Sequence, residues 1–185
     1  MDLEAANHVL ASALAVGPRC GSVILVGIDG RSGAGKSTLA ARVSDLALAR
    51  HLRTTTVHVD VLCPDWDGLP AVRSRLVAVV EQLAADPVGS ATYPTWDWIE
   101  KRPGPDASVP PSDLVIIEGV TASDPAWAER RSVTVWVEAP APLRKERAIA
   151  RDGDSFARHW DAWAAAEDGY FGAHPPPADL VVDGR

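Results

Sequence analysis

One stretch of eight residues constrains this chain more than any other. Residues 30–37 read Gly-Arg-Ser-Gly-Ala-Gly-Lys-Ser and match the phosphate-binding pattern G-x-x-x-x-G-K-[ST] at every fixed position. An apolar, β-branched run at residues 22–28 precedes the pattern, and residues 38–43 have the composition of a helix. The pattern therefore lies between a predicted buried strand and the N-terminus of a predicted helix, as its chemistry requires.

The glycines of this stretch explain how it would bind an anion. Glycines allow the backbone to curl tightly and to turn successive N–H groups toward one centre, and the positive end of the following helix strengthens such a nest. Lys36 would contact the β- and γ-phosphates of ATP, and the Ser37 hydroxyl would ligate Mg²⁺. The residues expected to bind the nucleotide are Gly30, Ser32, Gly33, Ala34, Gly35, Lys36, Ser37 and Thr38.

Bulk composition limits the class of protein. The 185 residues are 46% hydrophobic and 23% charged, which suits one soluble globular domain over residues 1–185. The formal net charge of −7 argues against nucleic acid and against an anionic membrane as partners, because both favour a basic surface. Cys20 and Cys63 have no metal-ligand spacing and are expected to be reduced, buried thiols of a cytoplasmic protein. The sequence leaves the oligomeric state open, a homodimer included.

Helical and strand patterns alternate along the chain. Apolar residues spaced by three and four predict helices at residues 3–16, 39–51, 71–83, 143–151 and 155–168. Apolar, β-branched runs predict strands at residues 22–28, 54–60, 114–117, 133–137 and 180–182. Because parallel strands need crossover helices on the faces of the sheet, we expect a three-layer α/β/α P-loop NTPase fold with a mostly parallel sheet of about five strands.

Two carboxylates follow predicted strands, at the edge where such sheets bind their ligands. Glu118 is expected to hold Mg²⁺ together with Ser37, directly or through water. Asp60 would accept the proton of an attacking hydroxyl, which would make the protein a kinase. The alternative is that Asp60 caps the next turn and that Glu118 caps a helix or faces solvent.

Three arginines are spaced by three and four residues near the C-terminus. Arg144, Arg147 and Arg151 would share one helix face, and Asp152-Gly153 is expected to end that helix. We expect lid helices within residues 141–168 that close on the triphosphate, with Arg147 and Arg151 as catalytic residues. A solvated basic face is the alternative. The nearby Trp160 and Trp163 are expected to anchor the core.

Residues 87–111 are rich in proline, glycine and aromatic residues and read as a long loop, which in a compact domain is usually functional. Within it, residues 93–111 are expected to form the acceptor side of the site. Tryptophans offer stacking faces, and an aspartate accepts hydrogen bonds from hydroxyls. The alternative is that the tryptophans pin the loop onto the domain. The residues expected to bind the acceptor are Asp60, Trp66, Tyr93, Trp96, Asp97, Trp98 and Arg102.

Over most of its length the chain resembles the uridine kinase branch of small P-loop kinases, most closely at residues 27–38. In that family an aspartate after the phosphate-loop helix serves as the base for the nucleoside 5′-hydroxyl, and Asp60 matches it. The family's acidic strand end followed by glycine matches Glu118-Gly119. Val61-Leu62-Cys63 follow Asp60, where family members usually place an aromatic residue.

The same resemblance covers the acceptor and lid regions. Pro94, the run Trp96-Asp97-Trp98 and Arg102 look like the family segment that holds the nucleoside. Arg147 and the pair Arg151-Asp152 match the arginines of the family's lid helix. The chain is shorter than typical uridine kinases and looks most like the short, functionally unassigned kinase-like ATP-binding proteins related to that family.

Residues and resemblance together predict an ATP- and Mg²⁺-dependent phosphotransferase that moves the γ-phosphoryl group to a hydroxyl of a small molecule, with a nucleoside among the candidates. One alternative is a kinase of an antibiotic or a sugar alcohol. Another is a nucleotide-binding switch without catalysis. A GTPase switch needs an Asn/Thr-Lys-x-Asp run, which the sequence lacks, and residues 65–68 fit D-x-x-G by letter only.

Overall fold

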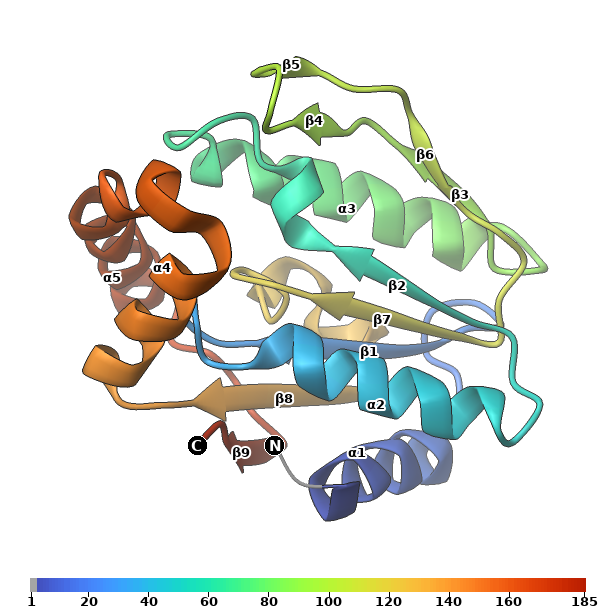
Figure 1. Cartoon of the computed structure of the whole chain (residues 1–185). Coiled ribbons are helices and arrows are strands. Elements are labelled where there is room, and N and C mark those ends of the chain that lie inside the picture. The colour runs from blue at the N-terminus through green and yellow to red at the C-terminus, as the bar shows by residue number, and fades with distance from the viewer. Residues whose placement is uncertain (1–2) are drawn as a thin grey trace.

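A computed structural model describes residues 3–185 and has a five-stranded sheet at its centre. All neighbouring strands of this sheet pair in parallel, in the order β2-β7-β1-β8-β9 (Figure 1). The strands are β1 (Ile24–Asp29), β2 (Thr54–His58), β7 (Leu114–Glu118), β8 (Val133–Glu138) and β9 (Leu180–Asp183). The predicted parallel sheet of about five strands is confirmed.

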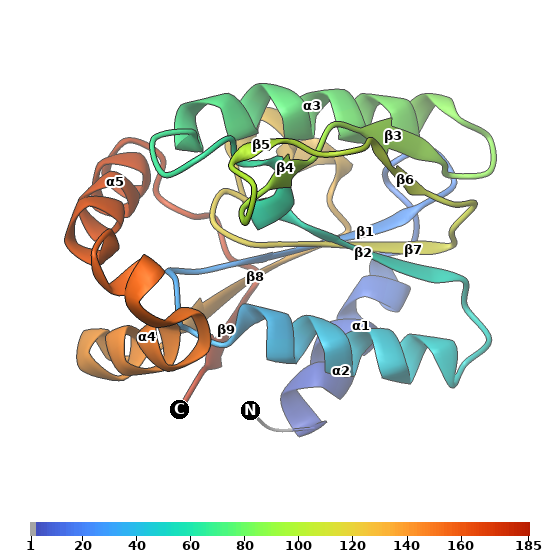
Figure 2. The same ribbon diagram turned by 45° about the horizontal axis from the view of Figure 1, so that its top comes forward.

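Helices cover both faces of this sheet. The α-helices are α1 (Leu3–Val16), α2 (Lys36–Leu48), α3 (Leu69–Ala85), α4 (Ala141–Ala157) and α5 (Trp160–Ala173), and two short 3₁₀ helices are η1 (Val59–Leu62) and η2 (Pro125–Arg130). Helices α1 and α2 lie on one face, and α3 and η2 on the other (Figures 1 and 2). Helices α4 and α5 stand beside the carboxyl ends of the strands. The three-layer α/β/α prediction is therefore correct.

Two hydrophobic clusters hold the layers together, one on each face of the sheet. Successive side chains of a strand point to opposite faces, so Leu25 packs in the cluster that contains α3, whereas Val26 packs with α1 and α2. Val115 and Ile116 of β7 divide in the same way. Burial on both faces explains why these strands read as continuous apolar runs rather than as alternating patterns.

Residues 87–111 form an arm with its own strands rather than the irregular loop that was expected. Strand β3 (Ala91–Tyr93) pairs antiparallel with β6 (Ala107–Val109), and β4 (Trp96–Asp97) pairs antiparallel with β5 (Arg102–Pro103). The arm packs against α3 through β3 and against η1 through β4, on the outer side of the molecule (Figures 1 and 2). Strands of two or three residues are too short to produce a periodic pattern, which is why the sequence did not predict them.

Three boundaries near the site differ from the prediction. Strand β2 ends at His58, so Asp60 lies in the first turn of η1 rather than on the strand. Helix α4 extends to Ala157 as two helical stretches joined at Gly153, whose φ of 66° and ψ of −152° are not helical, so the break predicted at Asp152-Gly153 is present but the chain resumes a helix after it. Helix α5 begins at Trp160, five residues later than expected.

The structure also shows the state of the two cysteines and the character of the helices. Cys20 and Cys63 are buried and free, as predicted. None of the helices found between residues 3 and 185 combines the length and the apolar character needed to span a bilayer.

Candidate active site

The phosphate-binding loop connects β1 to α2. Gly33 and Gly35 adopt φ values of 77° and 104°, which residues with a Cβ rarely tolerate. Their backbone N–H groups donate to no acceptor among residues 3–185, and no side chain caps the first turn of α2. Unpaired amides at a helix N-terminus, aimed by a glycine-rich turn, form a cradle for an anion. The loop therefore fits the phosphates of a nucleotide.

Lys36, Ser37 and Glu118 meet beside this cradle. Lys36 is mostly buried, and its ammonium group donates to the carbonyl oxygen of Arg31 at 3.1 Å. The Ser37 hydroxyl donates to Oε1 of Glu118 at 3.0 Å. A hydroxyl and a carboxylate side by side are the hard oxygen ligands that Mg²⁺ prefers. The structure thus brings together the two residues that the sequence predicted as metal ligands.

His58 is a neighbour of this pair that the sequence did not single out. Its Nδ1 lies 2.6 Å from Oε1 of Glu118, because His58 and Glu118 are register partners at the ends of β2 and β7. The hydrogen bond to Glu118 raises the pKa of His58. Burial pushes the pKa of Glu118 upward, but His58 and Lys36 outweigh it, so the net shift is downward and Glu118 stays ionised.

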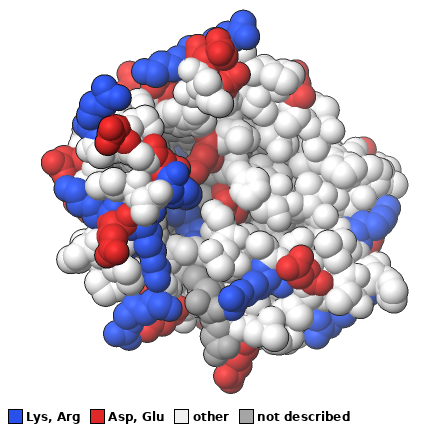
Figure 3. Space-filling model, in the orientation of Figure 1, with Lys and Arg blue, Asp and Glu red and all other residues white. Residues whose placement is uncertain are grey.

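Asp60 faces the same region from η1. Figure 3 shows a hollow beside the α4–α5 side of the molecule, with acidic and basic side chains inside it. The Asp60 side chain is accessible to solvent, yet desolvation by the surrounding protein raises its pKa, opposed by Lys36 and reinforced by Glu118. An accessible carboxylate with a raised pKa is suited to accepting a proton.

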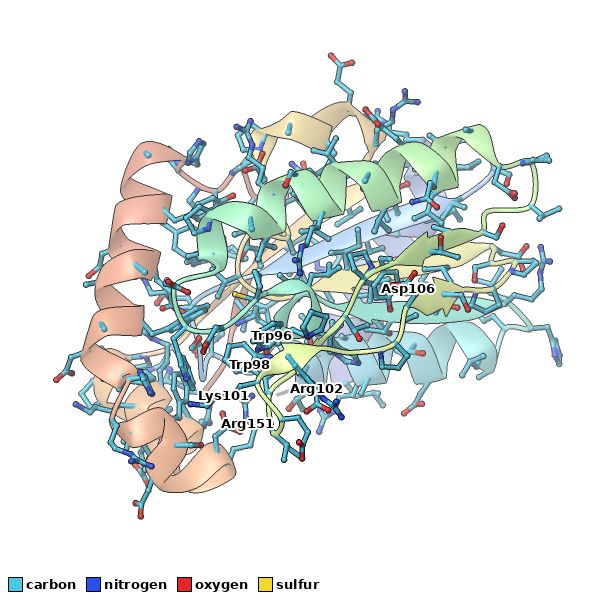
Figure 4. The ribbon with its side chains drawn as sticks, turned by 90° about the horizontal axis from the view of Figure 1, so that it is seen from above. Trp96, Trp98, Lys101, Arg102, Asp106 and Arg151 are labelled. Atoms are coloured by element: carbon cyan, nitrogen blue, oxygen red, sulfur yellow. The ribbon has the colours of Figure 1, made fainter. Side chains whose placement is uncertain are left out.

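Trp98 connects the arm to Asp60. Its indole Nε1 donates to the backbone carbonyl oxygen of Asp60 at 2.9 Å. Figure 4 shows Trp98 and Lys101 near the tip of the arm, on the side of the molecule where Arg151 projects from α4. Trp96 is half-buried, and its Nε1 has no hydrogen-bond partner in the part of the chain that the structure describes. The arm therefore forms one wall beside the carboxylate.

The other arm residues have structural partners. Oδ1 of Asp97 accepts hydrogen bonds from the N–H groups of Ile99 and Glu100 at 2.9 and 3.0 Å, which fixes the turn between β4 and β5. These bonds lower the pKa of Asp97, and Arg102, its exposed partner across the hairpin, adds to the effect. Tyr93 is only 8% exposed and packs in the hydrophobic core on the α3 side, so its side chain lies in the protein interior and not on the surface of the arm.

Trp66, predicted as an acceptor contact, lies at the centre of an aromatic cluster. Its ring stacks on His159 with a centroid distance of 4.5 Å and on Phe156 at 5.1 Å. The edge of Trp98 approaches it at 4.9 Å. Trp66 therefore joins the loop before α3, the arm and the C-terminal helices α4 and α5, and its ring is largely occupied by protein contacts.

The three arginines of α4 lie on one helix face, as their spacing predicts, but they have different partners and do not act as one cationic surface. Arg144 is buried and donates to the carbonyl oxygens of Ala139 at 3.0 Å and Ser32 at 3.3 Å. Arg147 donates to the carbonyl oxygen of Gly184 at 2.6 Å. Of the three, Arg151 is the one that approaches Asp60 and Glu118, because the start of α4 packs against the phosphate-binding loop and residue 184, whereas its later turns lie near the acids.

Arg151 pairs with Asp152 through two hydrogen bonds of 2.7 and 2.8 Å. This pairing raises its pKa, with contributions from Asp60 and Glu118, so the guanidinium lies within electrostatic reach of both acids. Trp160 and Trp163 are buried, which confirms that they anchor the core. Trp163 also donates to the hydroxyl of Ser32 at 2.8 Å, a contact with the phosphate-binding loop that no sequence pattern indicated.

Asp29, at the end of β1, is the most deeply buried acid at the site. Its carboxylate accepts hydrogen bonds from the N–H groups of Gly30 at 2.7 Å and Thr121 at 3.2 Å, and from the N–H and hydroxyl of Ser123 at 2.8 and 2.6 Å. Burial raises its pKa to about 6 against these bonds. Asp29 thus joins the start of the phosphate-binding loop to the loop that follows β7.

No protein-family model matches the sequence, and no curated protein matches it either. Solved structures do share its fold. A possible uridine kinase from Bacillus stearothermophilus superposes with a TM-score of 0.67 at 23% identity, over 97% of this chain and 98% of that chain. A proposed fructose transport system kinase from Silicibacter sp. TM1040 gives a TM-score of 0.65 at 24% identity, over 98% of both chains.

A third similar structure is the D-glycerate 3-kinase from Cryptococcus neoformans, with a TM-score of 0.59 at 14% identity, over 97% of this chain and 95% of that chain. All three comparisons cover nearly the whole length of both chains, so the similarity extends beyond the phosphate-binding loop to the fold as a whole. This chain has the fold of the uridine kinase-like P-loop kinases.

Proposed function

We propose that this protein is an ATP- and Mg²⁺-dependent phosphotransferase that moves the γ-phosphoryl group to a hydroxyl of a small molecule. The observation that carries the proposal is the meeting of Lys36, the Ser37–Glu118 pair and Asp60 at one edge of the sheet. A phosphate cradle, a pair of metal ligands and a candidate base are the parts that phosphoryl transfer requires.

In this proposal Asp60 accepts the proton of the acceptor hydroxyl. The hydroxyl oxygen forms a bond to the γ-phosphorus, and the bond from that phosphorus to the β–γ bridging oxygen breaks, which releases ADP. Lys36 stabilises the charge on the transferred group, and Arg151, whose guanidinium is within electrostatic reach of Asp60 and Glu118, adds to it. Mg²⁺ held by Ser37 and Glu118 would neutralise charge on the β- and γ-phosphates.

The acceptor would lie between Asp60 and the arm. Trp98 is anchored to the Asp60 backbone, so a ligand that reaches this carboxylate passes beside its indole ring. A flat or ring-shaped molecule with several hydroxyls suits such a wall, since an aromatic face favours stacking and a carboxylate favours hydroxyl donors. A nucleoside meets this description, and so do sugar alcohols and hydroxylated antibiotics.

The proposal is tested by a screen for ADP release over nucleosides, sugars and amino alcohols, with ATP and Mg²⁺ present. Asp60→Asn should retain ATP affinity and abolish transfer to the acceptor that the screen identifies, because an amide keeps the shape but does not accept the proton. Lys36→Ala should lose transfer by orders of magnitude while the protein stays folded.

Asp45→Asn is a matched control, since Asp45 is an exposed acid on α2 far along the helix from the loop. It should transfer phosphate at the wild-type rate. Equal rates for wild type and Asp60→Asn would show that Asp60 is only a turn residue. A wild type that binds ATP and transfers to no hydroxyl in the panel would favour a nucleotide-binding switch instead.

A further inference from the structure

Ser32 of the phosphate-binding loop is held at all three of its polar groups by the lid helices. Its N–H donates to Oε1 of Glu167 on α5 at 2.8 Å, and its hydroxyl accepts from Nε1 of Trp163 at 2.8 Å. Its carbonyl oxygen accepts from Arg144 of α4 at 3.3 Å. The conformation of this residue is therefore fixed from outside the loop rather than by the loop itself.

Arg31, the residue before Ser32, is also held by α5. Arg31 forms an ion pair of 2.6 Å with Asp168 of α5, and its guanidinium lies 5.4 Å from the ring centroid of Phe171. The carbonyl oxygen of Arg31 is the acceptor for the ammonium group of Lys36 at 3.1 Å. Helix α5 thus orients the carbonyl that positions the lysine of the loop.

Gly33, on the other side of Ser32, is in backbone contact with α4. A Cβ at Gly33 would lie only 2.1 Å from the carbonyl oxygen of Arg144, in addition to the cost of its φ of 77°. No side chain fits between the loop and the first turn of α4. Three consecutive loop residues are therefore in direct contact with α4 or α5.

A buried carboxylate lies at the centre of this contact, and burying a charged group costs free energy. Glu167 is 1% exposed, and its nearest cation is Arg144, 3.9 Å away and also buried. Oε1 of Glu167 accepts a second hydrogen bond from Trp163 at 2.9 Å, one helical turn before it on α5. A carboxylate near a phosphate site also repels phosphates, so the hydrogen bonds that it accepts from the Ser32 N–H and from Trp163 must offset both costs.

We propose that Glu167 and Trp163 are positioning residues for nucleotide binding. They hold residues 31–33 in the phosphate-binding conformation before the nucleotide arrives, and Arg144 neutralises the carboxylate that does so. The lid helices are then part of the cradle, because a movement of α5 changes the path of the loop amides and the position of the Lys36 ammonium group. This inference rests on the nucleotide-binding part of the proposed function and does not depend on the acceptor.

The test compares Glu167→Ala and Trp163→Phe with Glu146→Ala, a control at an exposed acid of α4. Isothermal titration calorimetry with ADP and Mg²⁺ gives the affinity, and hydrogen–deuterium exchange of the nucleotide-free protein follows the peptide that spans residues 30–38. Losing one buried, charge-assisted hydrogen bond should weaken ADP binding about tenfold or more in Glu167→Ala. Trp163→Phe should weaken it less, because its ring still fills the space.

In both variants the peptide of residues 30–38 should exchange faster than in the wild type, while peptides from β1 and β7 keep their protection. The Glu146→Ala control should match the wild type in both measurements. Lower melting temperatures with unchanged ADP affinity and unchanged exchange of the loop would overturn the inference and leave α5 as packing alone. A wild type that binds no nucleotide would refute the proposed function, and the exchange measurement would still decide the role of α5.

Discussion

Asp29 predicts that the free energy of unfolding falls as the pH rises, which is the opposite of the usual effect of a carboxyl group. The carboxyl is fully buried, and its pKa is raised from 3.8 to about 6 because burial outweighs the hydrogen bonds that it accepts. Between these values the folded state binds more protons than the unfolded chain. The contribution of Asp29 to the free energy of unfolding is therefore greatest below about pH 4 and is lost as the pH rises through about 6.

The size of this effect follows from the two pKa values. Their difference corresponds to about 3 kcal/mol, which is a large part of the stability of a domain of this size. Asp29→Asn removes the titration but places an amide N–H₂ opposite the N–H of Ser123, so one of the four hydrogen bonds is lost. That loss should cost about 1–3 kcal/mol at all pH values.

The assay is urea unfolding followed by tryptophan fluorescence, for wild type and Asp29→Asn, at intervals from pH 4.5 to 8. The wild type should be the more stable protein at pH 4.5, and its advantage should shrink by about 2 kcal/mol by pH 8, because about 1 kcal/mol of the full effect is already lost between pH 3 and 4.5. Other titrating groups affect both proteins alike and cancel in the difference. A difference between the two proteins that stays constant with pH would refute the assignment of the raised pKa to Asp29.

Two further predictions concern the metal ligands and the arm. Glu118→Gln should raise the Mg²⁺ concentration needed for half-maximal transfer by about tenfold or more, because an amide binds the ion more weakly than a carboxylate; an unchanged Mg²⁺ titration would remove Glu118 from the metal site. Asp97→Ala removes the acceptor for two turn amides and should lower kcat/KM for the acceptor about tenfold while the KM for ATP stays unchanged. A lower melting temperature with unchanged acceptor kinetics would instead show that Asp97 and its turn are structural.

Much of the fold and the centre of the site could be predicted from the sequence because their signals are local. The loop at residues 30–37 requires glycines at fixed positions, and a buried parallel strand must be apolar on both faces. A few consecutive residues are therefore enough to recognise each pattern. The strand order places the ends of β2, β7 and β1 together, and this is why acids that follow separate strands, Asp60 and Glu118, meet near Lys36.

The remaining features depend on contacts between residues far apart in the chain, which only the tertiary structure decides. His58 contacts Glu118 through strand register, and Glu167 reaches Ser32 across 135 residues, so neither pair leaves a periodic or motif signal. The same holds for the arginines of α4: helical spacing put them on one face, but the packing of the helix end buried Arg144 and left Arg151 near the acids. A helical period fixes the direction of a side chain relative to its own helix, whereas its partner depends on what packs there.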